Sequence, residues 1–116
     1  MRELIKKLVE TYGPSGAEEQ IRDAIRAEVE PLVDEVRVDA LGSLIAHKKG
    51  DGQRLLLDAH MDEIGVMVTY VDEKGFARFT RIGGVSPLTC IGSRVAFEDG
   101  KVGVIGVEQK RDDTNK

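Results

Sequence analysis

The stretch from Arg54 to Val68, RLLLDAHMDEIGVMV, constrains the fold more than any other part of this chain. Its leucine run, Leu55 to Leu57, predicts a strand that is buried on both faces, as in a mixed or parallel sheet covered by helices. Side chains alternate between the two faces of a strand. One face therefore carries Leu57, Ala59 and Met61, and the other carries Asp58, His60 and Asp62. Such strands present their ligands at the carboxyl end.

The polar residues on this stretch indicate metal binding. His60 offers a neutral imidazole to a zinc-like divalent ion, and a carboxylate that accepts the other ring N–H would fix its tautomer. Asp62 is the candidate for that carboxylate. Two residues span roughly 6.5 Å along an extended strand, so a direct contact requires a bend after His60, within residues 61–65. His-x-Asp alone is a weak motif, and a hydrogen-bonded, partly buried histidine without a ligand role is the alternative.

Length and composition limit the classes of protein to which the chain can belong. Its 116 residues, 41% of them hydrophobic, suffice for one modest domain with a hydrophobic core. A net charge of −4 and 4% aromatic residues argue against nucleic-acid binding. The absence of a long apolar run and of a secretory leader predicts no membrane partner. The single cysteine, Cys90, fits a cytoplasmic location.

The first forty residues are predicted to be mainly helical. Apolar residues at helical spacing predict a helix over residues 1–12, which Gly13 to Gly16 interrupts. Ser15 and Glu18 have the spacing of a capping box for a second helix. That helix ends near Pro31, and its apolar face consists of Ile21, Ala24, Ile25 and Val29.

The remainder of the chain is predicted to be rich in β-structure. Glycine-containing turns separate short apolar runs over residues 33–38, 43–47, 66–70, 76–82, 94–97 and 102–107. The last four of these runs predict a small barrel or a partly closed sheet. His47 is interpreted as a solvated residue of an edge strand and not as a ligand. Residues 108–116 have no apolar residue and are expected to be mobile.

Five strings identify a family resemblance. They are GPSGAEEQIR at 13–22, DALGSLIA at 39–46, LLLDAHMDEIGVMV at 55–68, GFARFTRIGGVSP at 75–87 and GKVGVIGV at 100–107. In order and spacing they resemble the dinuclear metalloaminopeptidases that assemble as tetrahedral dodecamers. This family includes glutamyl and deblocking aminopeptidases, and some members carry an older label as endoglucanases of the cellulase M type.

The resemblance implies an α/β fold class and a specific division of the chain. Residues 1–67 would begin a zinc-peptidase-like α/β catalytic domain with two helices and a mixed sheet. Residues 68–107 would begin an inserted small β-barrel domain, and 108–116 would be a charged segment. The resemblance also implies a peptide substrate, two divalent ions (zinc or cobalt) and a homo-dodecamer. His60 matches a metal ligand, and Asp62 matches the catalytic-site carboxylate that orients it.

The remaining ligands of the family follow its inserted domain, so this chain is expected to be about the first third of such an enzyme and inactive alone. A zinc site needs about three protein ligands for each metal, and His47 is the only other histidine. Two alternatives stay open. One is a non-catalytic binding or assembly module. The other is a glycoside hydrolase, which needs two carboxyl groups about 5–5.5 Å or 6.5–9.5 Å apart.

Overall fold

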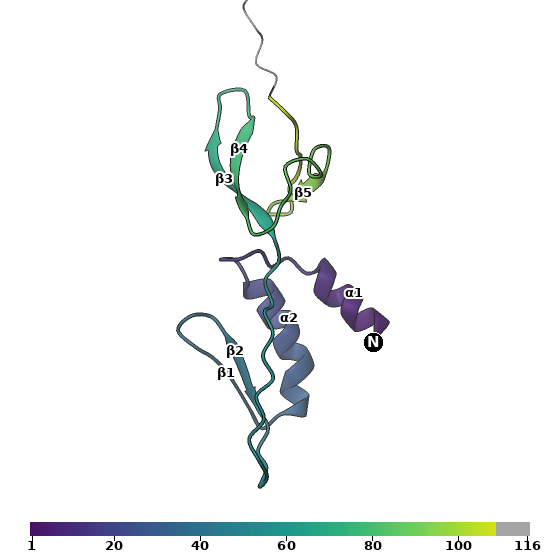
Figure 1. Cartoon of the computed structure of the whole chain (residues 1–116), viewed down its shortest axis with the longest axis vertical. Helices are drawn as coiled ribbons and strands as arrows, with labels where there is room; N and C mark the ends of the chain where they lie inside the picture. The colour runs from purple at the N-terminus through teal and green to yellow at the C-terminus, as the bar shows by residue number, and fades with distance from the viewer. Residues whose placement is uncertain (109–116) are drawn as a thin grey trace, which may run out of the picture. The chain divides into compact units, whose positions relative to one another are not determined.

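A computed structural model describes residues 1–108 of the chain (Figure 1). The predicted charged segment therefore lies outside the described residues, except for Glu108. The chain divides into two compact units, Met1–Gly83 and a second that begins at Gly84. Helices and strands occur together, which confirms the α/β class. The domain boundary predicted after residue 67 stays a prediction.

Two helices open the first unit. Helix α1 spans Arg2–Glu10 and α2 spans Glu19–Val29, followed by the 3₁₀ turn η1 at Glu30–Leu32. Helix α1 ends because Thr11 is extended, with φ −82° and ψ 128°. An ion pair joins the helices, with Lys7 Nζ 2.7 Å from Glu28 Oε1. No helix in residues 1–108 is long and apolar enough to cross a membrane.

The predicted capping box of α2 is wrong. The helix begins after Glu18, and no side chain caps it. A capping serine must directly precede the first helical residue, and Ser15 lies too far upstream of Glu19. Glu18 instead accepts a 2.7 Å hydrogen bond from the backbone N–H of Gly16. The Ser15 hydroxyl donates to Asp62.

A β-hairpin follows the helices, as predicted. Strands β1 (Glu35–Val38) and β2 (Leu44–His47) are antiparallel, and β2 packs beside α2 (Figure 1). Asp39 shapes the turn, since its Oδ1 accepts hydrogen bonds of 2.9 Å from the backbone N–H groups of Leu41 and Ser43. His47 is exposed at the end of β2, in agreement with its interpretation as a solvated edge residue.

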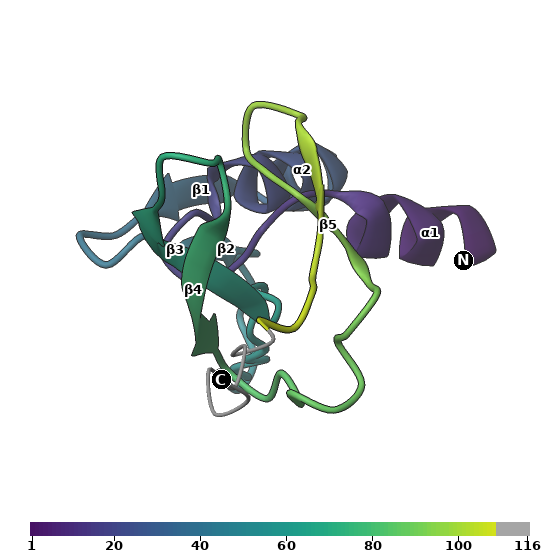
Figure 2. The same ribbon diagram turned by 90° about the horizontal axis from the view of Figure 1, so that it is seen from above.

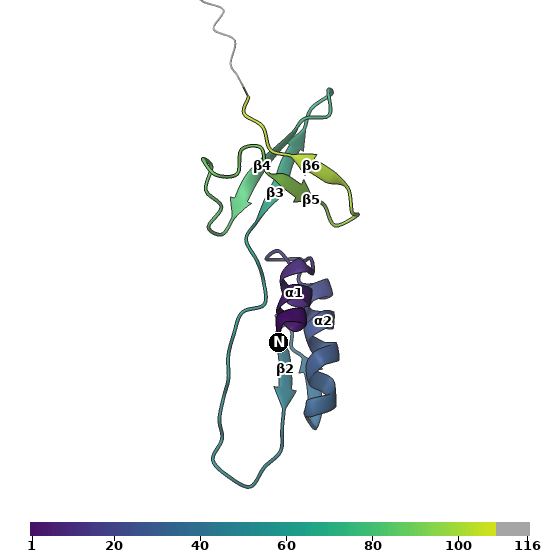
Figure 3. The same ribbon diagram turned by 90° about the vertical axis from the view of Figure 1, so that its right-hand side faces the viewer.

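Two further antiparallel pairs confirm the other predicted hairpins. In the first unit, β3 (Gly65–Val71) pairs with β4 (Ala77–Ile82) (Figure 2). In the second unit, β5 (Arg94–Ala96) pairs with β6 (Val102–Val104) (Figure 3). Over residues 1–108 the three pairs remain separate two-stranded sheets. A mixed sheet and a closed barrel therefore do not form within this part of the chain.

The predicted strand over the leucine run is also wrong. Residues 53–62 have no strand partner among residues 1–108, and β3 begins only at Gly65. Leu55, Leu56 and Leu57 are 83%, 86% and 87% exposed. A strand requires neighbours for its backbone N–H and C=O groups, and none of the described segments supplies them there.

The hydrophobic core expected from composition is almost absent. Among the large apolar side chains of residues 1–108, only Ile21 and Ile105 are buried. Single two-stranded hairpins are marginally stable because they bury little apolar surface. Within residues 1–108, the apolar content is therefore not sufficient for an extensive core in separate two-stranded sheets.

Candidate functional site

The loop before α2 holds the segment that follows the leucine run. The backbone N–H of Glu63 donates a 2.9 Å hydrogen bond to the carbonyl oxygen of Gly13. Pro14 and Glu63 form an isolated parallel bridge. Gly65 allows this approach, since a Cβ atom there would lie 3.2 Å from the Cβ of Pro14. Residues 62–65 are thus anchored on the loop.

The loop is in turn seated on α2. A Cβ atom on Gly13 would lie only 2.4 Å from Cγ2 of Ile21, whose side chain is buried. Real Cβ atoms do not approach other atoms so closely, so only glycine permits this packing. The first glycine of the GPSG string, Gly13, therefore has a steric role in placing the site.

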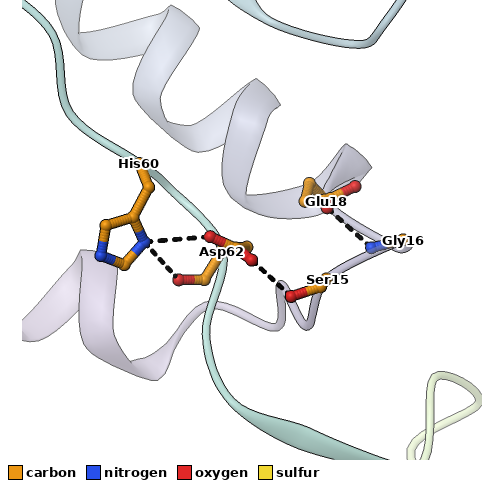
Figure 4. A network of polar contacts seen from close by, with 5 residues as sticks. All are labelled: Ser15, Gly16, Glu18, His60 and Asp62. Carbon is orange, nitrogen blue, oxygen red and sulfur yellow. Dashed lines mark hydrogen bonds and ion pairs between the residues drawn. The ribbon is translucent and has the colours of Figure 1, made fainter. Parts of the chain in front are cut away.

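His60 and Asp62 form the centre of the candidate site (Figure 4). His60 Nδ1 lies 2.9 Å from Asp62 Oδ1 and 3.0 Å from the main-chain oxygen of Asp62. Residues 60–62 are not in a strand, which provides the bend that the contact requires. Both neighbours of Nδ1 are acceptors, so in the neutral ring Nδ1 carries the proton and Nε2 has the free lone pair. The side chain of His60 is 85% exposed.

Ser15 completes the polar arrangement from the other side of Asp62. Its hydroxyl donates a hydrogen bond to Oδ2 (Figure 4). Each carboxylate oxygen thus has its own partner. These hydrogen bonds, first from Ser15 and then from His60, hold the pKa of Asp62 below its usual value.

Sequence reasoning assigned Ser15 to a helix cap and missed this contact. Ser15 and Asp62 are 47 positions apart, so no local spacing connects them. The only available signal was that their strings, GPSG and LLLDAHMD, belong to one set of family motifs.

The other candidates are not brought to the pair. Asp58, predicted on the same side as His60, is exposed and forms no hydrogen bond with either residue in the described chain. His47 lies on β2 and does not join the pocket beside His60. That pocket, of about 280 Å³, has a mostly apolar lining: Leu8, Val9, Thr11, Ile21, Ile25, His60, Met61, Asp62 and Glu63.

The described residues fit one metal ligand and no complete metal site. Within residues 1–108 there is no group of three or more histidine, cysteine, aspartate or glutamate side chains that could hold a metal ion. His60 nevertheless has the features of a ligand: an exposed ring, a carboxylate on Nδ1, and an Nε2 that has no hydrogen-bond partner among the described residues.

Comparison of sequences identifies relatives along nearly the whole chain. A protein of Acetivibrio thermocellus is 55% identical over 113 residues, which are 97% of this chain and 34% of that protein. The lysyl aminopeptidase of Pyrococcus furiosus is 44% identical and matches 90% of this chain and 32% of its own length. The chain therefore spans about a third of these relatives.

Solved structures give the same result. The TET1 peptidase of Pyrococcus horikoshii, which assembles into a tetrahedron or a large octahedral shell, matches with a TM-score of 0.80 at 36% identity, over 99% of this chain and 36% of its own. Another TET structure, at 38% identity, is a dodecamer. A Thermotoga maritima protein named endoglucanase matches with a TM-score of 0.83 at 40% identity, over 90% of this chain and 34% of its own. Residues 42–115 match the M42 glutamyl aminopeptidase family, and the chain belongs to that family.

Proposed function

We propose that this chain is the N-terminal part of a metal-dependent aminopeptidase, in which His60 binds one of two divalent ions and Asp62 orients His60. The observation that carries the proposal is the 2.9 Å contact between His60 Nδ1 and Asp62 Oδ1. A carboxylate on one ring nitrogen makes the other a better metal ligand and fixes its direction. The aminopeptidase names of the relatives support the reaction class.

The chemistry of the reaction follows from the metals and from residues beyond this chain. Two divalent ions, zinc or cobalt, would polarise the scissile carbonyl of a peptide and lower the pKa of a bound water. Within this chain, the ionised Asp62 carboxylate accepts a hydrogen bond from Nδ1–H of His60, and His60 presents Nε2 to the metal. A homo-oligomer, the dodecamer of the resemblance, is part of the proposal, since the matched TET proteins assemble in this way. A cytoplasmic location also stays a prediction.

A glycoside hydrolase is the second candidate, because one matched structure is named endoglucanase. The general acid of such an enzyme must hold a proton near neutral pH, which requires a raised pKa. Asp62 has the opposite property, because hydrogen bonds from Ser15 and His60 lower its pKa. Asp62 therefore does not fit the role of that general acid, whereas an ionised carboxylate fits the orienting role. A non-catalytic assembly module would need neither the free Nε2 of His60 nor the carboxylate behind it.

The experiment uses the full-length polypeptide that carries this chain, freed of metal and reloaded with zinc or cobalt. Wild type is compared with His60→Ala and with the matched histidine control His47→Ala, which changes an exposed residue of β2. Metal content, hydrolysis of aminoacyl p-nitroanilides and hydrolysis of carboxymethylcellulose are measured.

We expect His60→Ala to lose metal and at least about a hundredfold in peptide hydrolysis, which is the upper range for residues that only support a ligand. His47→Ala should match wild type. Full metal content and normal turnover in His60→Ala would disprove the assignment. Cleavage of cellulose but not of the peptide analogues by wild type would favour the glycoside hydrolase.

A further inference from the structure

We propose that Ser15 is a positioning residue for this site: its hydroxyl, by donating to Oδ2 of Asp62, holds the carboxylate in the orientation in which Oδ1 meets Nδ1 of His60. The inference deepens the proposed function and rests on the role of His60 as a ligand. Ser15 itself touches neither metal nor substrate in this proposal. It acts through Asp62.

The Asp62 carboxylate needs such a second partner. The terminal torsion of aspartate is broad and nearly two-fold, so a hydrogen bond to one oxygen leaves the carboxylate plane poorly fixed. The side chain of Asp62 is 36% exposed, so water can compete for a free oxygen. With His60 on Oδ1 and Ser15 on Oδ2, both oxygens are engaged and the plane is determined. Hydrogen bonds to a charged acceptor are also stronger than neutral ones.

Ser15 is held firmly enough to act as a support. The backbone N–H of Ala17 donates a 2.9 Å hydrogen bond to the carbonyl oxygen of Pro14, which closes a turn around Ser15. On one side of this turn, Gly13 packs on Ile21 and accepts the N–H of Glu63. On the other side, Gly16 donates to the Glu18 carboxylate. The same loop therefore anchors the residue after Asp62 and carries the hydroxyl that reaches its side chain.

The proposal is tested in the full-length enzyme by a pair of substitutions with equal shape. Threonine at position 15 keeps a hydroxyl, whereas valine replaces it with a methyl group, so Ser15→Thr and Ser15→Val differ only in the hydrogen bond. Ser15→Ala is added. Ser43→Ala is the control, because it removes another serine hydroxyl, in the β1–β2 turn, and leaves the backbone N–H of residue 43 that donates to the Asp39 carboxylate.

Three properties are measured: cobalt affinity and visible absorption during titration of the metal-free protein, kcat and KM separately, and the melting temperature without metal. We expect Ser15→Val and Ser15→Ala to bind cobalt about tenfold more weakly, in the range for residues that orient a ligand. Their cobalt spectrum should change and kcat should fall more than KM rises. Ser15→Thr should stay close to wild type, and Ser43→Ala should equal it.

Equal cobalt affinity and spectra in Ser15→Thr and Ser15→Val would overturn the role of Ser15, whatever the stability of either variant. His60→Ala separates this failure from that of the proposed function. If His60→Ala loses metal while both position-15 variants bind cobalt as wild type does, only the role of Ser15 is wrong. If His60→Ala keeps its metal, the proposed function itself fails.

Discussion

The backbone N–H of Glu63 donates a 2.9 Å hydrogen bond to the carbonyl oxygen of Gly13. This bond joins the loop before α2 to the segment that carries the candidate site. It sets the spacing that lets the Ser15 hydroxyl reach the Asp62 carboxylate. The polar site therefore depends on backbone packing as much as on its own side chains.

Gly13→Ala should destabilise the protein and weaken metal binding together. The added Cβ atom would lie 2.4 Å from Cγ2 of the buried Ile21, so loop and helix must separate. Overpacking of this kind costs about 1–3 kcal/mol. Thermal unfolding and cobalt titration of the full-length protein measure the two effects. Gly50→Ala is the control, since a Cβ atom there meets nothing within 4 Å. Equal losses in both variants would contradict the steric role of Gly13.

Asp62→Asn should weaken metal binding about 10–100-fold while leaving the shape of the side chain unchanged. The amide has no negative charge, so it stabilises the Nδ1–H tautomer of His60 less well and makes Nε2 a poorer ligand. Isothermal titration with zinc measures the affinity. The control is the Asp39→Asn variant, which carries the same substitution in the β1–β2 turn. It should bind zinc with the affinity of wild type. A normal affinity in Asp62→Asn would show that this carboxylate does not act through His60.

The β1–β2 turn should lose stability in acid. Backbone N–H bonds, first from Ser43, hold the pKa of Asp39 below its ordinary value of 3.8. A lowered pKa in the folded state stabilises the turn above pH 3.8, and this contribution disappears as the pH falls through the lowered pKa. Melting temperatures from pH 6 to pH 2 should therefore fall more steeply in wild type than in Asp39→Asn. If the melting temperatures of the two proteins fell in parallel with pH, the stabilising role of the Asp39 carboxylate would be contradicted.

The leucine run should be unpaired in the 116-residue chain and paired with other strands in the full-length protein. In the chain, Leu55 to Leu57 are exposed, and residues 53–62 lack strand partners among the described residues 1–108. Amide hydrogens there should exchange within seconds, and the exposed leucines should cause self-association. In the full-length protein we expect slow exchange, because additional strands would pair with this run. Hydrogen-exchange mass spectrometry distinguishes the two states, and equally fast exchange in both would contradict the pairing.

For the same reason, Leu56→Lys should reduce self-association of the 116-residue chain. The side chain of Leu56 is 86% exposed, so the lysine costs no packing there and adds charge to an apolar segment. Sedimentation velocity measures the change. Lys49→Ala, in the neighbouring turn, is the control and should not lower the fraction of oligomer.

Local patterns were sufficient for most of the secondary structure. Apolar residues at helical spacing predicted α1 and α2, and glycine and aspartate turns predicted the three hairpins, because these signals act within a few residues. The His-x-Asp spacing likewise predicted the His60–Asp62 pair, on condition that the chain bends between them. The family strings identified the M42 resemblance, and the comparisons confirmed it.

The failures all involve partners that are distant in the sequence. Leu55 to Leu57 have the composition of a buried strand, yet a strand exists only where another segment satisfies its backbone groups. Ser15 and Glu18 have the spacing of a capping box, yet α2 begins later and Asp62 takes the Ser15 hydroxyl.

The sequence by itself determined the helices, the hairpins, the family and the pair of candidate residues, since each is encoded in local spacing or in ordered strings. The tertiary structure alone decided which loop supports Asp62, because that contact depends on Gly13 packing against Ile21 and on the chain returning to it at Glu63. It also decided that the leucine run is unpaired within residues 1–108, since strand pairing is a property of two segments and not of one.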